Sequence, residues 1–305
     1  MTTVNNRLRN VQALTVNGVS AGGLTTLSIN QGYDNMPASA PDGIGGPAIV
    51  DREVQYCRGN GAIQDWSHLV DLLTGTLGTL AVYSRKSGTA AATGYVLHTL
   101  TNPVIHRTRI SQSIRDYMTC GFDFECKAAD ETKGFADMYV PTDSQSAPSY
   151  VSAARGGYRI SDAYIDDTAD VDIYHVTAFE FDLAMQIAKA CNDADVGYTC
   201  VDAIADGMAA GGSITIQDES ISGAQTKAQQ LLSHAAKPLV LTVTQGSGAT
   251  AKTVTIANCL FGNAREAMTN GPFFAVTLDF MVANDASTPL TLEGDNKIIT
   301  IADAA

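Results

Sequence analysis

The sequence is poor in charge, has no long hydrophobic run and contains a single tryptophan. Charged residues make up 17% of its 305 residues and hydrophobic residues 45%, which excludes an intrinsically disordered chain, because such chains are rich in charge and poor in apolar residues. The longest apolar runs are far shorter than the roughly 18 residues of a membrane-spanning helix. No apolar segment follows the polar first residues, so we expect no secretory signal and folding in a cytoplasm-like compartment.

Basic residues are scarce as well. Nineteen lysines and arginines stand against 32 aspartates and glutamates, which gives a net charge of −13. Residues 1–150 carry 11 basic and 13 acidic residues, a balance of −2, whereas residues 151–305 carry 8 and 19, a balance of −11. Binding to nucleic acid depends on contacts between basic side chains and phosphates, so this composition argues against a nucleic-acid-binding protein.

No catalytic or metal-binding motif is complete. Residues 18–22 (GVSAG) match the G-x-S-x-G pattern of a hydrolase, but strand-like residues follow where a helix is required. The acidic clusters at 162–172 and 193–197 lack the spacing and the final glutamate of a calcium-binding loop. The six cysteines include no C-x-x-C pair and are expected to be free thiols. We therefore expect no enzyme, no cofactor and no metal site.

One order of predicted elements occurs twice: a hairpin-like start, a long loop, a strand, a helix, a hairpin and a long closing strand. The first copy places its helix at 62–74 and its closing strand at 120–125. The second copy places them at 224–235 and 276–281. This repeat predicts a mainly β fold of two tandem β-sandwich or β-barrel-like units, each with one flanking α-helix. The units are expected at residues 1–130 and 156–305, joined by a linker at 131–155, and are expected to superpose.

Within this scheme, the matching first strands are predicted at 48–53 and 214–219, after glycine pairs. Residues 32–47 and 192–212 are expected to form long loops that contact neighbouring subunits or stacked rings and become ordered only on assembly. The first helix is expected to be anchored on its sheet by four residues at helical spacing: Trp66, Leu69, Val70 and Leu73.

Alternation of apolar and polar residues predicts a strand over 179–187, although a helix also fits part of the pattern. The strand buries five apolar side chains: Phe179, Phe181, Leu183, Met185 and Ile187. It leaves Glu180 and Asp182 on the opposite, wet face. Elsewhere, three arginines share one strand parity, and the basic face that they form is expected to contact another protein surface: Arg107, Arg109 and Arg115.

This order of elements resembles the major tail tube proteins of tailed bacteriophages in a duplicated, two-domain form. The resemblance implies a structural virion protein whose β-sandwiches pack side by side, six to a ring, with the inner sheets closing into a channel for DNA. Duplicated members form trimers that present six similar units. The implied partners are further copies of the chain, other tail proteins and the passing genome, with no membrane, and assembly takes place in the host cytoplasm. Glu180 and Asp182 are then expected to face the lumen, where carboxylates repel phosphates.

Two alternatives remain open. One is a distal tail or baseplate ring protein of the same fold. The other is a carbohydrate-binding β-sandwich module, for which exposed aromatic platforms would be required, whereas the one tryptophan, Trp66, lies on the predicted helix stripe. Electron microscopy separates these alternatives, because tubes or rings favour a tail protein and dispersed monomers favour a binding module or an enzyme.

Overall fold

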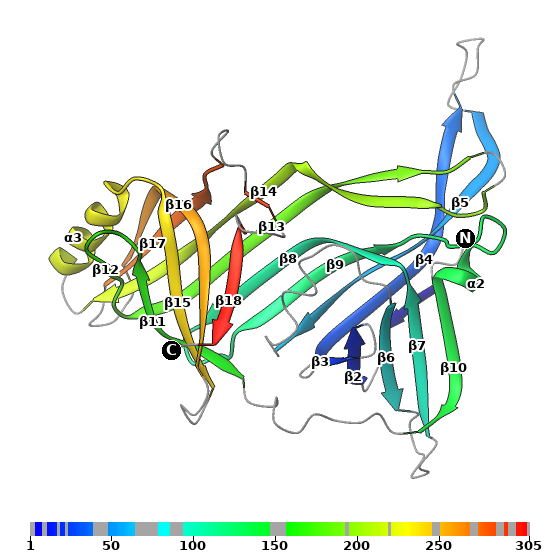
Figure 1. The fold of residues 1–305 in the computed structure, drawn as a ribbon, viewed down its shortest axis with the longest axis horizontal. Helices are drawn as coiled ribbons and strands as arrows, with labels where there is room; N and C mark the ends of the chain where they lie inside the picture. Colours follow the sequence, from blue (N-terminus) through cyan, green and yellow to red (C-terminus); the bar gives the residue numbers. More distant parts are fainter. Residues whose placement is uncertain are drawn as a thin grey trace.

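The computed structural model of the chain is mainly antiparallel β-structure, which confirms the predicted mainly β class (Figure 1). It describes residues 4–7, 11–16, 19–21, 24–38, 48–64, 79–85, 94–146, 157–192, 195–218, 221–245, 251–268, 274–284, 290–291 and 297–303. In these residues, no helix has both the length and the apolar character needed to cross a membrane.

The first half of the chain contributes these elements: β1 Val4–Arg7, β2 Val11–Val16, β3 Val19–Ala21, β4 Leu24–Ala38, β5 Ala48–Ile63, β6 Thr79–Arg85, β7 Tyr95–Thr101, β8 Pro103–Ser113, β9 Thr119–Cys126, α2 Phe135–Met138 and β10 Tyr139–Gln145. The second half contributes these: β11 Tyr158–Ile165, β12 Val171–Asp172, β13 Val176–Ala190, β14 Cys200–Asp218, α3 Ile221–Leu232, β15 Lys237–Gln245, β16 Ala251–Met268, β17 Phe274–Val282 and β18 Ile299–Asp303.

The strands form two sheets. The larger sheet has the order β1-β4-β5-β9-β8-β13-β14-β17-β16-β15-β11-β12, with β18 paired to β16, and the smaller has the order β10-β7-β6-β2-β3. The larger sheet passes from one half of the chain to the other where β8 pairs with β13. Figure 1 shows this sheet crossing the molecule, with α3 at one end and α2 at the other.

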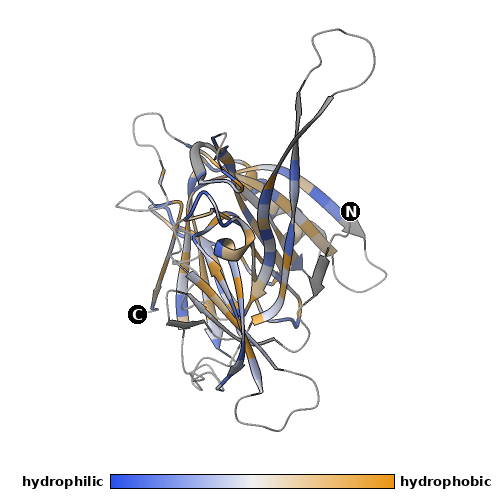
Figure 2. Ribbon diagram, turned by 90° about the vertical axis from the view of Figure 1, so that its right-hand side faces the viewer, coloured by the Kyte–Doolittle hydropathy of each residue, from blue (hydrophilic) through white to orange (hydrophobic). Residues whose placement is uncertain are grey.

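Apolar side chains alternate with polar ones along the strands, so each sheet has a dry and a wet face (Figure 2). In β9, for example, Cys120, Phe122 and Phe124 are buried, whereas Asp123 between the two phenylalanines is partly exposed. The same rule in β13 buries Phe181. The core is therefore built from aromatic and branched side chains on one face of each strand.

The two halves share one pattern of strand pairing. The order β4-β5-β9-β8 in the first half has its equivalent in β13-β14-β17-β16 in the second. Beside these, β2 pairs with β3 and β6, as β11 pairs with β12 and β15. In both halves the pairing skips a residue at matching places. The shift in β2·β6 matches the one in β11·β15, β4·β5 matches β13·β14, and β8·β9 matches β16·β17. Coincident bulges support the prediction of two tandem units, because bulges are local features that no general rule of sheet formation imposes.

An asparagine marks the same corner in each half. Asn102 lies between β7 and β8 with φ 46°, and Asn258 lies inside the long strand β16 with φ 47°. The asparagine carbonyl accepts a backbone hydrogen bond from Lys127 in the first half and from Ala283 in the second. The offset along the chain from Lys127 to Ala283 equals the offset from Asn102 to Asn258, so donor and acceptor recur together. Asparagine tolerates the left-handed backbone that this corner requires.

A glycine lies beneath a phenylalanine at matching places in the two halves. Gly59 of β5 is opposite Phe124 of β9, and Gly212 of β14 is opposite Phe280 of β17. A Cβ on either glycine would come within 2.8 Å of that ring. The pairing therefore requires glycine, and it aligns Gly59 with Gly212. The alignment of 48–53 with 214–219 expected from the sequence is accordingly wrong, since it joined segments at different heights in the sheet.

The helix expected at 224–235 is α3, and the strand expected at 179–187 lies within β13. The first helix was expected to begin at Ala62, but Ala62 and Ile63 belong to β5. The proposed anchors of that helix lie outside the described residues: Trp66, Leu69, Val70 and Leu73.

The two segments expected to be long loops contain strand instead. Residues 32–38 continue β4, and residues 200–212 belong to β14, whereas residues 39–47 and 193–194 lie outside the described residues. The hairpins β4–β5 and β13–β14 thus extend beyond the body of the sheet as two-stranded arms, defined here as 32–38 with 48–56 and 186–190 with 200–204. Glycine and proline in the first segment made it resemble a loop, but the long-range pairing overrides that local preference.

The segment 131–155, expected to be a linker, contains α2 and β10, and β10 pairs with β7. Its Tyr139 hydroxyl lies 2.7 Å from Nδ1 of the buried His98, whose Nε2 lies 2.7 Å from the Ser84 hydroxyl. Burial lowers the pKa of His98, which favours the neutral ring in this arrangement. Three strands of the smaller sheet, β6, β7 and β10, are connected through this histidine.

Replacing Gly212 with alanine is expected to destabilise the protein by about 1–3 kcal/mol, because the new Cβ would overlap the carbonyl oxygen of Glu180 in β13. Gly59→Ala is expected to cost a similar amount, since its Cβ would overlap the carbonyl oxygen of Ser28 in β4. Gly262→Ala is the control, because its Cβ would meet nothing within 4 Å. Urea unfolding measures all three, and equal losses for Gly212→Ala and Gly262→Ala would contradict the close approach.

Candidate assembly interface

The contact between β8 and β13 is the place where the two halves of the chain meet within one sheet. Residues Arg107–Ser113 of β8 pair with Ala178–Ala184 of β13 in antiparallel register, with Arg109 opposite Asp182. On the dry face, Ile110 of β8 lies opposite Phe181 of β13, and both are buried. Backbone hydrogen bonds and apolar packing therefore connect the halves at the same residues.

Charged side chains line the wet face of this contact. Arg107 donates hydrogen bonds to both carboxylate oxygens of Asp182, with Nε 2.9 Å from Oδ1 and 3.1 Å from Oδ2. Arg109 Nε lies 3.7 Å from Asp182 Oδ2, and its Nη2 lies 3.3 Å from Asp123 Oδ2. Hydrogen bonding to Asp182 raises the pKa of Arg107, which keeps this group charged. The two arginines thus join carboxylates from both halves of the chain.

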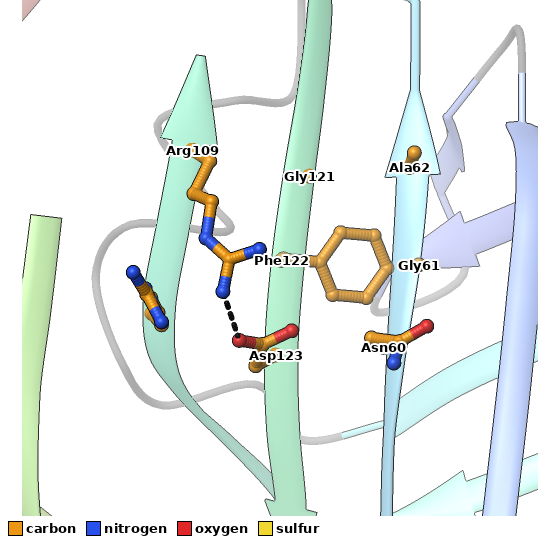
Figure 3. A pocket seen from close by; sticks show the side chains of 8 residues that line it. Asn60, Gly61, Ala62, Arg109, Gly121, Phe122 and Asp123 are labelled. Carbon is orange, nitrogen blue, oxygen red and sulfur yellow. Dashed lines mark hydrogen bonds and ion pairs between the residues drawn. The ribbon is translucent and has the colours of Figure 1, made fainter. Parts of the chain in front are cut away.

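Figure 3 shows a pocket beside these ion pairs. Residues of β5, β8 and β9 line it, and Arg109 reaches across to Asp123: Asn60, Gly61, Ala62, Arg107, Arg109, Gly121, Phe122 and Asp123. Gly121 lies opposite Arg109 and leaves room for its side chain to lie along the sheet.

The second half repeats part of this arrangement. Arg265 of β16 forms an ion pair with Asp279 of β17, as Arg109 of β8 does with Asp123 of β9. The separation in sequence is 14 residues in both pairs. The offset from Arg109 to Arg265 is also the offset that relates the two corner asparagines. Asp182 of β13 has no such equivalent, because its counterpart in β4 is Asn30.

The structure places the predicted residues of β13 as follows. Phe179, Phe181 and Leu183 are buried, Glu180 is exposed, and Asp182 is partly exposed beside the arginines. The other two residues expected in the core, Met185 and Ile187, are only partly buried, because the pairing with β14 shifts after Ala184 and the strand continues into the arm. That Glu180 and Asp182 face a lumen remains a prediction.

The sequence indicated that Arg107, Arg109 and Arg115 contact another protein surface. The structure instead brings Arg107 and Arg109 to Asp182 of the same chain. Arg115 lies instead in the turn after β8, with φ 69°. No local pattern in the sequence links Asp182 with these arginines, because 75 residues separate Asp182 from Arg107.

The arm β13–β14 makes a second contact with the first half. Lys189 Nζ lies 2.5 Å from Oε1 of Glu125, which is 3% exposed, and 3.7 Å from Oδ2 of Asp34. The Tyr198 hydroxyl donates to Asp34 Oδ2 at 3.3 Å. Burial and the Asp34 carboxylate raise the pKa of Tyr198 to about 12, so the hydroxyl remains a donor at neutral pH.

Apolar and backbone contacts complete the docking of this arm. A small cluster near its tip contains four buried residues: Val54, Val104, Tyr198 and Val201. Gln55 donates its backbone N–H to the carbonyl of Val196 at 2.9 Å, and its side-chain Oε1 accepts from the N–H of Phe135 at 2.7 Å. The arm of the second half is therefore packed against β5, β8 and α2 of the first.

The arrangement supplies surface complementarity, with apolar residues on one face and paired charges on the other. Within the described residues, no group of three or more His, Cys, Asp or Glu side chains is placed to hold a metal ion. No protein-family model matches the sequence, and no curated protein matches it significantly. The function must therefore be inferred from the geometry of the chain.

Replacing Lys189 with methionine is expected to cost about 2 kcal/mol of unfolding free energy, because it leaves the buried Glu125 carboxylate without its cation. The double variant Lys189→Met with Glu125→Gln is expected to recover most of this loss, since the buried side chain is then neutral and Asp34, the other neighbour of Lys189, still accepts from the Tyr198 hydroxyl. Lys133→Met is the control, because Lys133 is exposed and pairs with Asp130 on the surface. Urea unfolding measures the effect, and equal losses for both single lysine variants would exclude a special role for Lys189.

Proposed function

We propose that the protein is a structural subunit that assembles with further copies of itself into rings and a tube, as a tail tube protein of a bacteriophage does. The observation that carries this proposal is the contact between β8 and β13. It joins two halves with the same strand pairing through their sheet edges, so the chain itself contains one joint of the kind that a ring of such units would need.

The two outer strands of a run of eight within the larger sheet support the proposal. The eight strands β4-β5-β9-β8-β13-β14-β17-β16 begin with the equivalent of β13 and end with the equivalent of β8. A joint between β16 of one chain and β4 of the next would therefore repeat the internal joint. Repeating a head-to-tail contact around an axis closes a ring when the rotation per unit allows it. Three chains would present six similar units.

In this proposal the wet face of the eight strands lines the channel. That face carries both arginines and carboxylates: Arg58, Arg107, Arg109 and Arg265 with Asp123, Glu180, Asp182 and Asp279. Three of these arginines are in ion pairs with Asp123, Asp182 or Asp279. Paired arginines are less available to phosphate than free ones, and Glu180 is exposed. Such a wall would let DNA pass without holding it.

A distal tail or baseplate ring protein would use the same joint but would not stack into long tubes. The distinction therefore lies in the length of the assembly. A carbohydrate-binding module would stay dispersed.

Negative-stain electron microscopy and native mass measurement of concentrated protein test the proposal. We expect rings that stack into tubes, with a ring mass three times the 32.0 kDa of one chain. A ring of six chains would overturn the trimer, and single rings without stacking would favour a ring protein of the same fold. Protein that remains monomeric at every concentration and ionic strength tested would overturn the proposal as a whole.

A further inference from the structure

The sheet edge that the proposed joint requires on β4 is occupied by the chain's own N-terminal strand. We propose that β1 caps this edge in the free subunit and is displaced by β16 of a second copy, so that β1 controls assembly. This inference rests on the proposed self-assembly and names the register of the joint and the element that blocks it.

The cap is defined by its backbone register. The four residues of β1, Val4–Arg7, pair antiparallel with Ser28–Gln31 on the side of β4 that faces away from β5. An exposed strand edge presents unpaired N–H and C=O groups and invites pairing with another chain. A strand that covers such an edge in the monomer prevents this pairing.

The internal joint identifies the strand that fits the same edge. Ile29 of β4 lies opposite Gly59, as Phe181 of β13 lies opposite Gly212, and the two glycines are equivalent. The counterparts of Glu180 and Asp182 are therefore Ser28 and Asn30. In β13 this stretch pairs with β8. In β4 the equivalent stretch pairs with β1.

The equivalent of β8 lies at the other end of the sheet. Beyond Cys259, β16 pairs with β17 alone in the described part of the chain. Thr108 and Ile110 of β8 are buried at the internal joint, whereas their counterparts Ala264 and Glu266 in β16 are exposed. The exposure of Ala264 is what the loss of a partner strand would produce, whereas Glu266 is a polar residue whose carboxylate accepts a hydrogen bond from Gln225 of α3.

Equivalence fixes the register of the joint between chains. Arg109 lies opposite Asp182 at the internal joint, so Arg265 of one copy is placed opposite Asn30 of the next. By the same rule Ala264 is placed opposite Gln31. The stretch of β4 that receives β16 thus includes Ser28–Gln31, which β1 now covers. The two occupants exclude each other.

Exchange of one strand for another costs little, because each backbone hydrogen bond lost with β1 is replaced by one with β16. A short strand such as β1 also makes few such bonds, so the uncapped state remains accessible. The internal joint is longer, since it extends from Arg107 to Ser113 in β8. A longer partner strand therefore displaces the shorter cap once the concentration of subunits is high enough.

The arms indicate the same neighbour. The arm of β13–β14 packs on the half of the chain whose β8 pairs with β13. Its equivalent, the arm of β4–β5, projects beyond the sheet in Figure 1. A second copy whose β16 pairs with β4 would lie where this arm can pack on it.

Cysteine cross-linking tests the register of the joint. In a background with Cys191→Ser and Cys200→Ser, which removes the cysteines that are not buried, Asn30→Cys with Arg265→Cys is expected to form disulfides between chains under mild oxidation. Asn30→Cys with Asn263→Cys is the control, because diagonal positions two residues apart are too distant for efficient disulfide formation. Rings that form in both variants without preferential cross-linking of the first pair would refute the register and leave the proposed function standing.

Locking and removing β1 test the cap. Asn5→Cys with Asn30→Cys, which are register partners, is expected to hold the oxidised chain monomeric and to assemble after reduction. Deleting residues 1–8 is expected to lower the protein concentration needed for assembly about tenfold. Without β1 every chain has a free β4 edge, whereas in the intact protein only the fraction with β1 detached can pair with a second copy. Light scattering measures both, with the same double-cysteine chain under reducing conditions as the control.

Each outcome separates the two ideas. Assembly of the oxidised locked chain as readily as the reduced one, or no change on deletion, would show that β1 is no cap while rings still form. If no variant assembles, including the deletion, the proposed function fails and the inference fails with it.

Discussion

The hydrogen-bonded pairing of β8 with β13 is the contact on which the rest of the architecture depends. It makes one sheet out of two halves, and it satisfies the backbone groups of two strands that would otherwise be edges. It also aligns Arg107 with Asp182 on the wet face and Ile110 with Phe181 on the dry face. The arm that continues from β13 then reaches the first half, where Lys189 meets the buried Glu125.

Local pattern in the sequence predicted the mainly β class, the hairpin strands and the helix α3, because alternation and helical spacing are short-range signals. The arms were missed because their pairing, not their composition, makes them strands. The alignment of the two halves was wrong at β5 because the relevant signal is a glycine, Gly59, opposite a phenylalanine far along the chain, Phe124. The ion pair between Asp182 and Arg107 was missed for the same reason, because the two residues are 75 positions apart in the sequence.

The acidic composition and the local electrostatics of the sheet lead to different expectations. A net charge of −13 suggests a uniformly acidic surface. On the wet face of the sheet, however, carboxylates alternate with arginines, and Asp182 is bound by Arg107. The total charge of a chain therefore says little about the charge of one face, because ion pairs arise between strands that are distant in sequence.

Placing both halves in one polypeptide has a consequence for the strength of their contacts. The joint between β8 and β13 forms at the same effective concentration however dilute the protein is, because a tether joins its two sides. It can therefore hold the ion pair of Arg107 and Asp182 without having to assemble from separate molecules. The equivalent stretch of β4 carries the uncharged Asn30, so the ionic contact is kept inside each chain, and the edge of β4 pairs with β1 without a charge at the position of Asp182.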